Sequence, residues 1–101
     1  MANDIRVIYR ATARKTILVI GKYTNNGAKK AKVTVIRDYL GELSKGDCIK
    51  VPVDLYLLAA RVHPSYVNDY IAADPDRIDQ LMRKLLIQAL NRKVEQLYPS
   101  Q

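Results

Sequence analysis

Three segments near the start of the chain have the residue pattern of β-strands, because β-branched and aromatic side chains fill them and turn or small polar residues separate them. Their sequences are IRVIYR at 5–10, TILVIGKY at 16–23 and KVTVIRDY at 32–39. Apolar and polar residues partly alternate in the first and third segments, whereas the middle one is apolar on both faces. The sequence Asn25-Asn26-Gly27 tolerates the positive φ of a tight hairpin turn. The pattern predicts an antiparallel meander with 16–23 at its centre.

The chain changes character after residue 40. GELSKGD at 41–47 predicts a loop, and CIKVPV at 48–53 predicts a fourth short strand. VDLYLLAARV at 53–62 is apolar along most of its length, so the spacing of its apolar residues does not distinguish a helix from a strand. A buried helix of about three turns is expected. PSYVNDYIAA at 64–73 predicts a short helix or turn in which Tyr66 and Tyr70 are one helical step apart.

The last segment predicts a long amphipathic helix. Asp74 is suited to the N-cap and Pro75 to the first helical position, and acids follow in the first turn, where the helix dipole favours negative charge. Apolar residues then recur at i, i+3 and i+4 over about 24 residues, or about 36 Å. The first half of this stripe is expected to cover the sheet. The remainder is expected to pack against a second copy or a partner subunit, and the predicted interface residues are Leu81, Leu85, Leu86, Leu90, Val94 and Leu97.

Together these elements predict an α+β fold: an N-terminal antiparallel sheet of three to four strands, followed by two or three helices, the last long and amphipathic. The 101 residues include 29 Ile, Leu or Val, enough for a modest core in a single domain over 1–101. No leader pattern or apolar run of eighteen residues is present, and the single cysteine has no partner for an internal disulfide. A cytoplasmic protein without membrane contact is expected.

Positive charge is concentrated in the first half of the chain. Residues 1–50 hold eleven Lys or Arg against four acids, while residues 51–101 hold six of each, so the whole net charge of +7 arises before residue 51. The domain therefore divides into a basic β-rich half, 1–53, and a neutral helical half, 54–101. Such a local excess attracts polyanions, of which nucleic acid is the commonest.

The predicted partner is therefore nucleic acid, with DNA favoured over RNA and phosphates as the main contacts. In the alternative interpretation, the lysines bind no ligand and only prevent edge strands from pairing with other chains and keep the hairpin tip soluble. Tyr9 and Tyr23 would stack on bases if exposed, although their strands are typical of a core. Asn25 and Asn26 would read base edges, but turn chemistry explains them equally well. The candidate nucleic-acid-binding residues are Arg6, Arg10, Arg14, Lys15, Lys22, Asn25, Asn26, Lys29, Lys30, Lys32 and Arg37.

Residues suited to catalysis are sparse. His63 and Cys48 are single examples of their types, too few for a zinc cluster within one chain. Ser44, Ser65 and Ser100 lack an elbow motif or a convincing base. Four aspartates would suit magnesium, but helix capping explains three of them; they are Asp69, Asp74, Asp76 and Asp79. No phosphate-binding glycine loop occurs, so a protein that is not an enzyme and has no metal or cofactor is expected.

One stretch resembles a known family. KVTVIRDYLGELSKGDCIKVPVDLYLLA at 32–59 is similar to the small β-rich domain of the GINS replication subunits, in which a Lys-Gly-(Asp or Thr) turn leads into a strand that ends in Leu-Pro or Val-Pro and is followed by a helix. Pro64, Tyr66 and the Ala-Asp-Pro at 73–75 follow in a similar order, so the resemblance covers residues 33–90. It implies a non-catalytic accessory or scaffold subunit of a DNA replication complex. A competing hypothesis is an interaction subunit that docks on a larger protein by its last helix.

Overall fold

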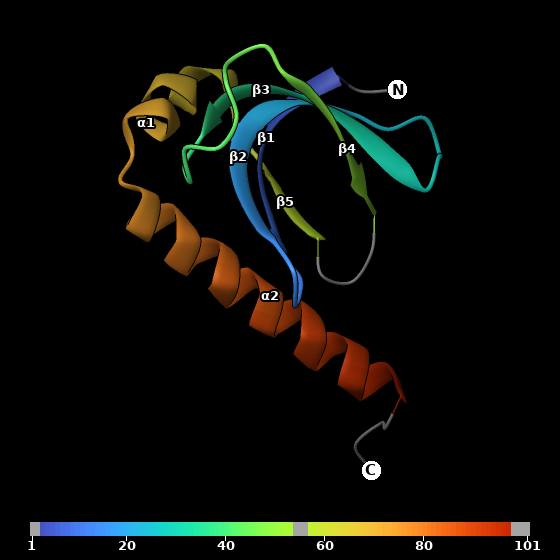
Figure 1. The fold of residues 1–101 in the computed structure, drawn as a ribbon. Coiled ribbons are helices and arrows are strands. Elements are labelled where there is room, and N and C mark those ends of the chain that lie inside the picture. Colours follow the sequence, from blue (N-terminus) through green and yellow to red (C-terminus); the bar gives the residue numbers. More distant parts are fainter. Residues whose placement is uncertain (1–2, 54–56, 98–101) are drawn as a thin grey trace.

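A five-stranded antiparallel sheet and a long helix form the fold (Figure 1). The computed structural model describes residues 3–53 and 57–97, apart from the side chains of residues 3, 93, 94, 96 and 97. The strands are β1 (Asn3–Ala11), β2 (Thr16–Thr24), β3 (Lys30–Asp38), β4 (Cys48–Pro52) and β5 (Leu57–Arg61), in the spatial order β4-β3-β2-β1-β5. A 3₁₀ turn η1 (Pro64–Tyr66), a short helix α1 (Val67–Ala72) and the helix α2 (Pro75–Leu97) follow.

The sheet carries a hydrophobic core on each face. One, here the helix-covered core, consists of Val7, Tyr9, Leu18, Ile20, Tyr39, Val62, Ile78 and Met82. The other, here the inner core, consists of Ile8, Val19, Tyr23, Ala31, Val33 and Val51. Because Val51 of edge strand β4 and Leu57 of edge strand β5 both pack in the inner core, the sheet curls around it, as Figure 1 shows.

The bend of the sheet depends on a glycine in β2. The register of β2 and β3 shifts between Ile20 and Gly21, which leaves Ile36 as the extra residue of β3. A Cβ atom on Gly21 would lie 2.5 Å from the Thr34 carbonyl oxygen and 2.9 Å from Val33 Cγ1, far inside contact distance. Only glycine therefore fits where the two strands approach so closely.

The helix expected at 53–62 is wrong over the described residues of that range, because Leu57–Arg61 is strand β5. β5 pairs antiparallel with β1, from Arg6 opposite Arg61 to Arg10 opposite Leu57. Its side chains contribute to both cores, so the strand is apolar on both faces and its sequence resembles that of a buried helix. The sheet thus has five strands instead of three to four, and the second half of the chain supplies one of them. Residues 54–56 lie outside the described residues.

The remaining predicted elements are confirmed. The three strands of the meander, β4 and the short helix lie within a few residues of their expected positions, and β2 is central. Asp74 caps α2, since its Oδ1 accepts a hydrogen bond from the Asp76 amide at 2.9 Å. Ile78 and Met82 are buried against the sheet, so the first half of α2 covers it as expected. Within the described residues no helix has the length and apolarity needed to cross a membrane.

Candidate nucleic-acid interface

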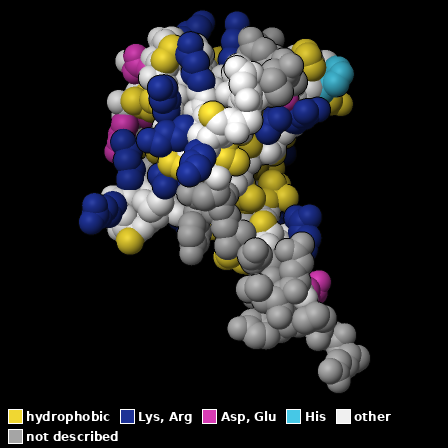
Figure 2. Space-filling view, turned by 90° about the vertical axis from the view of Figure 1, so that its right-hand side faces the viewer, with side chains coloured by type: hydrophobic (Ala, Val, Ile, Leu, Met, Phe, Trp, Pro, Cys, Tyr) yellow, Lys and Arg dark blue, Asp and Glu magenta, His cyan; other side chains and the backbone are white. Residues whose placement is uncertain are grey.

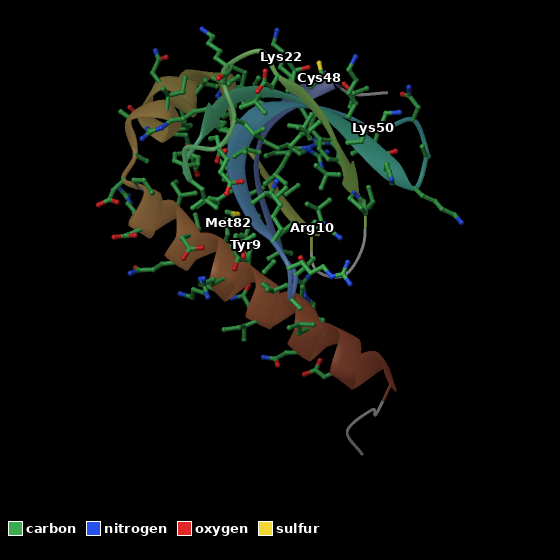
Figure 3. All side chains as sticks on the ribbon, viewed as in Figure 1. Tyr9, Arg10, Lys22, Cys48, Lys50 and Met82 are labelled. Carbon is green, nitrogen blue, oxygen red and sulfur yellow. The ribbon has the colours of Figure 1, made fainter. Side chains whose placement is uncertain are left out.

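Four lysines share one surface of β2, β3 and β4. The register places Lys22 beside Thr34 and Cys48, and Thr24 beside Lys32 and Lys50, on the face that α2 covers further along the sheet. The lysine face is defined by the exposed residues Lys22, Lys30, Lys32 and Lys50. In Figure 3, Lys22 and Lys50 lie at the end of the sheet away from α2. Lys and Arg side chains crowd the upper part of the view in Figure 2, with Asp and Glu side chains chiefly at its margins.

Positive charge on the lysine face is not neutralised within the described part of the chain. Lys32 lies directly opposite Lys50 across β3 and β4. Like charges in that position destabilise a sheet. The ion pairs between described residues involve Arg6, Lys15, Arg61 and Arg83, and none involves a lysine of this face. The surface therefore keeps a repulsion that an anion bound there would relieve.

The β2–β3 connection at 25–29 carries further candidates. Asn25 Oδ1 accepts a hydrogen bond from the Gly27 amide at 2.9 Å, and Gly27 has a φ of 87°. The Asn25 carbonyl group thus shapes the turn, as turn chemistry predicted. Asn26 and Lys29 are exposed and lie before the start of β3.

Two predicted arginines of β1 lie on the opposite side of the sheet. Arg6 donates to both carboxylate oxygens of Asp4, at 2.8 and 3.2 Å, and its guanidinium lies 4.2 Å from the centre of the Tyr23 ring. Asp4 also pairs with Arg61 at 3.0 Å, and the hydrogen bond from Arg6 is the main reason that the pKa of Asp4 is lowered. Arg10 is partly buried on the same side and has an interaction of its own. These arginines are separate from the lysine face.

The other predicted bases are also apart from the lysine face. Arg14 and Lys15 lie in the β1–β2 connection, and Lys22 is seven positions after Lys15 along β2, about 23 Å at 3.3 Å per residue. Lys15 Nζ is 3.6 Å from Glu42, and both side chains are more than half exposed. Arg37 donates to the carbonyl oxygens of Ile71 and Ala73 and so ties β3 to the end of α1. Of the nine predicted bases, the structure brings together Lys22, Lys30 and Lys32 on the lysine face.

Sequence reasoning missed Lys50, which lies closest in register to Lys32. The signal was available, since Ile49 and Val51 flank Lys50 in a short alternating strand, and both point toward the inner core. Tyr9 and Tyr23 are 2% and 6% exposed, so the interpretation of both rings as core residues is confirmed.

Several of the residues weighed for catalysis have structural partners. His63 Nδ1 accepts a hydrogen bond from the Ser65 amide at 3.2 Å and lies 2.8 Å from Ser65 Oγ. His63 thereby caps the N-terminus of η1. Asp79 pairs with Arg83 at 2.8 Å along α2. Among the described residues, no group of three or more His, Cys, Asp or Glu side chains is arranged to hold a metal ion.

The predicted interface residues of α2 fall into three groups. Leu81 is 41% exposed. Leu85 and Leu86 pack against the helix-covered core, and Leu90 is partly buried. Leu86 and Leu90 also line a groove of about 500 Å³ with Ala11, Thr12 and Ala13. The side chains of Val94 and Leu97 lie outside the described part of the structure.

No family model, curated protein or solved structure matches this chain. The similarity of residues 33–90 to the GINS domain therefore stays a prediction from the sequence. The lysine face and the grooves beside α2 are the features of the molecule from which a function is inferred.

Proposed function

We propose that this protein is a non-catalytic nucleic-acid-binding protein that contacts the phosphate backbone through its lysine face. The observation that supports the proposal is the direct opposition of Lys32 and Lys50, with Lys22 and Lys30 on the same surface and no described carboxylate paired with any of them. A solvated surface that serves only solubility usually mixes charges of both signs. Here four charges of one sign share one surface at a cost in stability.

The spacing of the lysines suits a phosphate backbone. Lys30 and Lys32 are two residues apart on β3, about 6.7 Å, and neighbouring strands add about 4.8 Å each from Lys22 to Lys50. Lysine presents a point charge on a flexible stem, which favours phosphates over base edges. Because no described aromatic ring lies among these lysines in the register of the sheet, base stacking has no part in the proposal. Binding independent of sequence follows. The preference for DNA over RNA rests only on the resemblance of residues 33–90 to the GINS domain.

We further propose that the biological context is DNA replication or a related information-processing complex, in which this chain is an accessory factor. The support for that context is the resemblance of residues 33–90 to the GINS domain, and the lysine face would supply its contact with DNA. The two proposals are separable, because phosphate binding depends only on the charges.

The salt dependence of binding to a fluorescent 20-base-pair duplex tests the proposal. Four phosphate contacts predict a slope of log K against log salt of about −3.6, which is a loss of about 150-fold between 50 and 200 mM salt. Lys32→Glu should weaken binding at least tenfold and by a similar factor for duplexes of unrelated sequence. Arg92→Glu makes the same charge change on exposed α2 and should leave the affinity almost unchanged. Equal effects of the two variants, or no binding at 50 mM salt, would count against the proposal.

A second candidate function is docking on a second copy of the chain through the C-terminal half of α2. The helix has 23 residues, about 35 Å, yet the buried ones among its described side chains, Ile78 and Met82, lie in its first turns. Ile87 is 59% exposed and Leu90 lines the groove with Ala11. Sedimentation velocity between 1 and 100 μM should show a dimer that Leu90→Glu abolishes and Gln88→Glu preserves. A monomer at every concentration would remove this candidate.

A further inference from the structure

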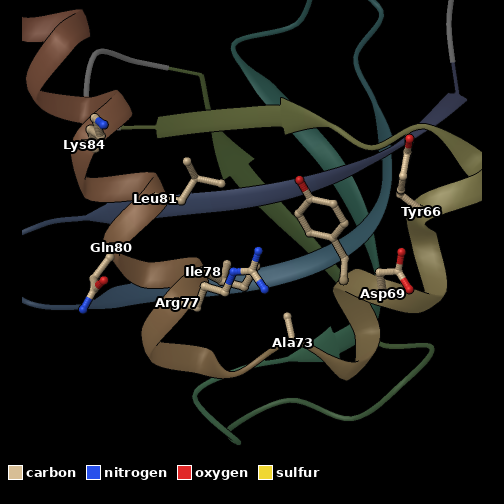
Figure 4. Close-up of a pocket in the computed structure, with 9 residues that line it drawn as sticks. Tyr66, Asp69, Ala73, Arg77, Ile78, Gln80, Leu81 and Lys84 are labelled. Atoms are coloured by element: carbon tan, nitrogen blue, oxygen red, sulfur yellow. The ribbon is translucent and has the colours of Figure 1, made fainter.

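A groove separate from the lysine face lies between α1 and the first turns of α2 (Figure 4). Its volume is about 530 Å³, within the range of ligand-binding sites, which is about 300–1,000 Å³. Apolar and polar side chains from η1, α1, the residue after α1 and α2 line this α1–α2 groove: Tyr66, Asp69, Tyr70, Ala73, Arg77, Ile78, Gln80, Leu81 and Lys84.

Each helix presents one face to the groove. On the α1 side, Tyr66, Asp69, Tyr70 and Ala73 follow the i, i+3, i+4, i+7 spacing that places residues on one helical face. On α2, Arg77, Leu81 and Lys84 form a stripe beside the one that Met82 and Leu85 direct at the sheet. Figure 4 shows Leu81 and Tyr66 on opposite sides of the groove.

Contacts below the groove hold the α1 side in place. The Arg37 guanidinium donates to the carbonyl oxygens of Ile71 and Ala73, and the Tyr39 hydroxyl donates to that of Tyr70. On the other side, Ile78 is buried in the helix-covered core. Both sides are therefore fixed to the sheet, and a ligand would not have to organise them, which favours binding.

The chemistry of the groove selects an acidic, apolar ligand. Tyr66 is 57% and Leu81 41% exposed, which leaves two large apolar surfaces facing solvent across the groove. Arg77 and Lys84 flank Leu81, and neither is paired with a carboxylate of the described residues. They are seven residues apart, about 10.5 Å along the helix, which is about three residues of an extended chain. Two carboxylates with that spacing could pair with both cations.

We propose that the α1–α2 groove binds a short acidic segment of a partner protein, in which one large apolar side chain lies between Tyr66 and Leu81 and carboxylates contact Arg77 and Lys84. Asp69 lines the α1 side of the groove, whereas Arg77 and Lys84 lie on the α2 side. A peptide is therefore favoured over nucleic acid, because its two carboxylates can both lie on the α2 side, whereas a nucleic acid carries a charge at every phosphate. The groove also has the shape to hold one side chain, whereas a phosphate backbone requires a continuous charged track. This inference does not depend on the function of the lysine face.

The test uses ¹⁵N-labelled protein and three six-residue peptides at up to 5 mM in 150 mM salt, followed by amide chemical shifts. The cores of the peptides are Glu-Phe-Ala-Glu, its charge-reversed form Lys-Phe-Ala-Lys, and Glu-Ala-Ala-Glu, each between two glycines. The first peptide should shift amides of residues 66–84 with a dissociation constant at or below the low millimolar range. The other two should bind at least fivefold more weakly, because each lacks either the complementary charge or the apolar side chain.

Variants localise the contact. Leu81→Asp should weaken the first peptide at least tenfold and Leu81→Met should not, and since Leu81 is partly exposed both should keep a dispersed spectrum. Arg77→Glu and Lys84→Glu should each weaken binding about threefold or more, as rim charges do. Arg92→Glu on the same helix and Lys32→Glu on the lysine face should leave it unchanged.

Four outcomes would overturn the inference. These are no shift at 5 mM, shifts confined to β2, β3 and β4, equal binding of the charge-reversed peptide, and the same groove shifts on addition of a dT12 oligonucleotide. The last outcome would identify the groove as part of the nucleic-acid site instead.

Discussion

Lys50→Glu is expected to raise the stability of the fold while it weakens nucleic-acid binding. Lys50 lies opposite Lys32, where the Cβ atoms of cross-strand partners are about 4.5–5.5 Å apart. Two unit charges about 6 Å apart in water interact by about 0.7 kcal/mol. Exchanging repulsion for attraction doubles that figure at low salt, and screening over about 10 Å at 0.1 M salt reduces it. A gain of about 0.5–1 kcal/mol in the free energy of unfolding follows.

Urea unfolding and thermal melting measure the gain. For a domain of this size, 0.5–1 kcal/mol corresponds to a rise in Tm of about 2–8 °C. Lys50→Gln removes the repulsion without adding attraction, so it should show about half the gain. Both increments should shrink when salt is raised to 1 M, where the screening length falls to about 3 Å.

Duplex binding by the same variant should move in the opposite direction. Reversing one charge removes one phosphate contact and adds a repulsion, so the slope of log K against log salt should fall in magnitude by about 1–2 from about 3.6. A more stable protein that binds more weakly cannot owe its loss of binding to unfolding. The reasoning would be refuted if Lys50→Glu lost stability, or if it bound duplex with unchanged affinity and slope.

Three further variants test the scaffold. Gly21→Ala should destabilise the protein by about 1–3 kcal/mol in urea unfolding, because its Cβ would meet the Thr34 carbonyl, and an unchanged midpoint would contradict the close approach of β2 and β3. The pKa of Asp4 is lowered below its usual 3.8, so the contribution of Asp4 to stability is present above that pH and is lost as the pH falls through the lowered pKa. Asp4→Asn should remove this part of the acid-unfolding curve. An unaltered curve would argue against the Arg6 contact. Tyr39→Phe should cost about 1 kcal/mol through the lost hydrogen bond to Tyr70. Burial raises the pKa of Tyr39 above 10.0, so the stabilising contribution of the Tyr39 hydroxyl should be lost as the pH rises through the raised pKa. A series of urea-unfolding curves at alkaline pH should show this loss for the wild type and not for Tyr39→Phe.

Much of the secondary structure could be predicted because its determinants are local. The alternation in β1 and β3 and the two-sided apolar run at Ile17–Ile20 identify strands and the central one among them. Asp74 and Pro75 mark the start of α2 within two residues. Strand β5 could not be found in this way, since an apolar segment that packs in two cores has no period, and its pairing with β1 joins residues about fifty positions apart.

The sequence predicted that the candidate site is basic, but it identified only some of the residues that belong to the site. Lys32 and Arg37 are both basic residues of β3, but Arg37 lies further along the strand, opposite Ile20, and binds the carbonyl oxygens at the end of α1. Arg6 is likewise neutralised by Asp4, which Arg61 of β5 also contacts. Lys50 joins the lysine face only because β4 pairs with β3 in the register that places it opposite Lys32.

The amino-acid sequence by itself determined the strands of the meander, the long capped helix and the excess of positive charge in the first half of the chain. The strands and the helix depend on neighbouring residues, and the net charge is a sum over residues that does not depend on the fold. Which of those charges share one surface, and which helix faces enclose the α1–α2 groove, was decided only by the tertiary structure. Cross-strand register and the curl of the sheet depend on pairings between distant segments, and no local pattern encodes them.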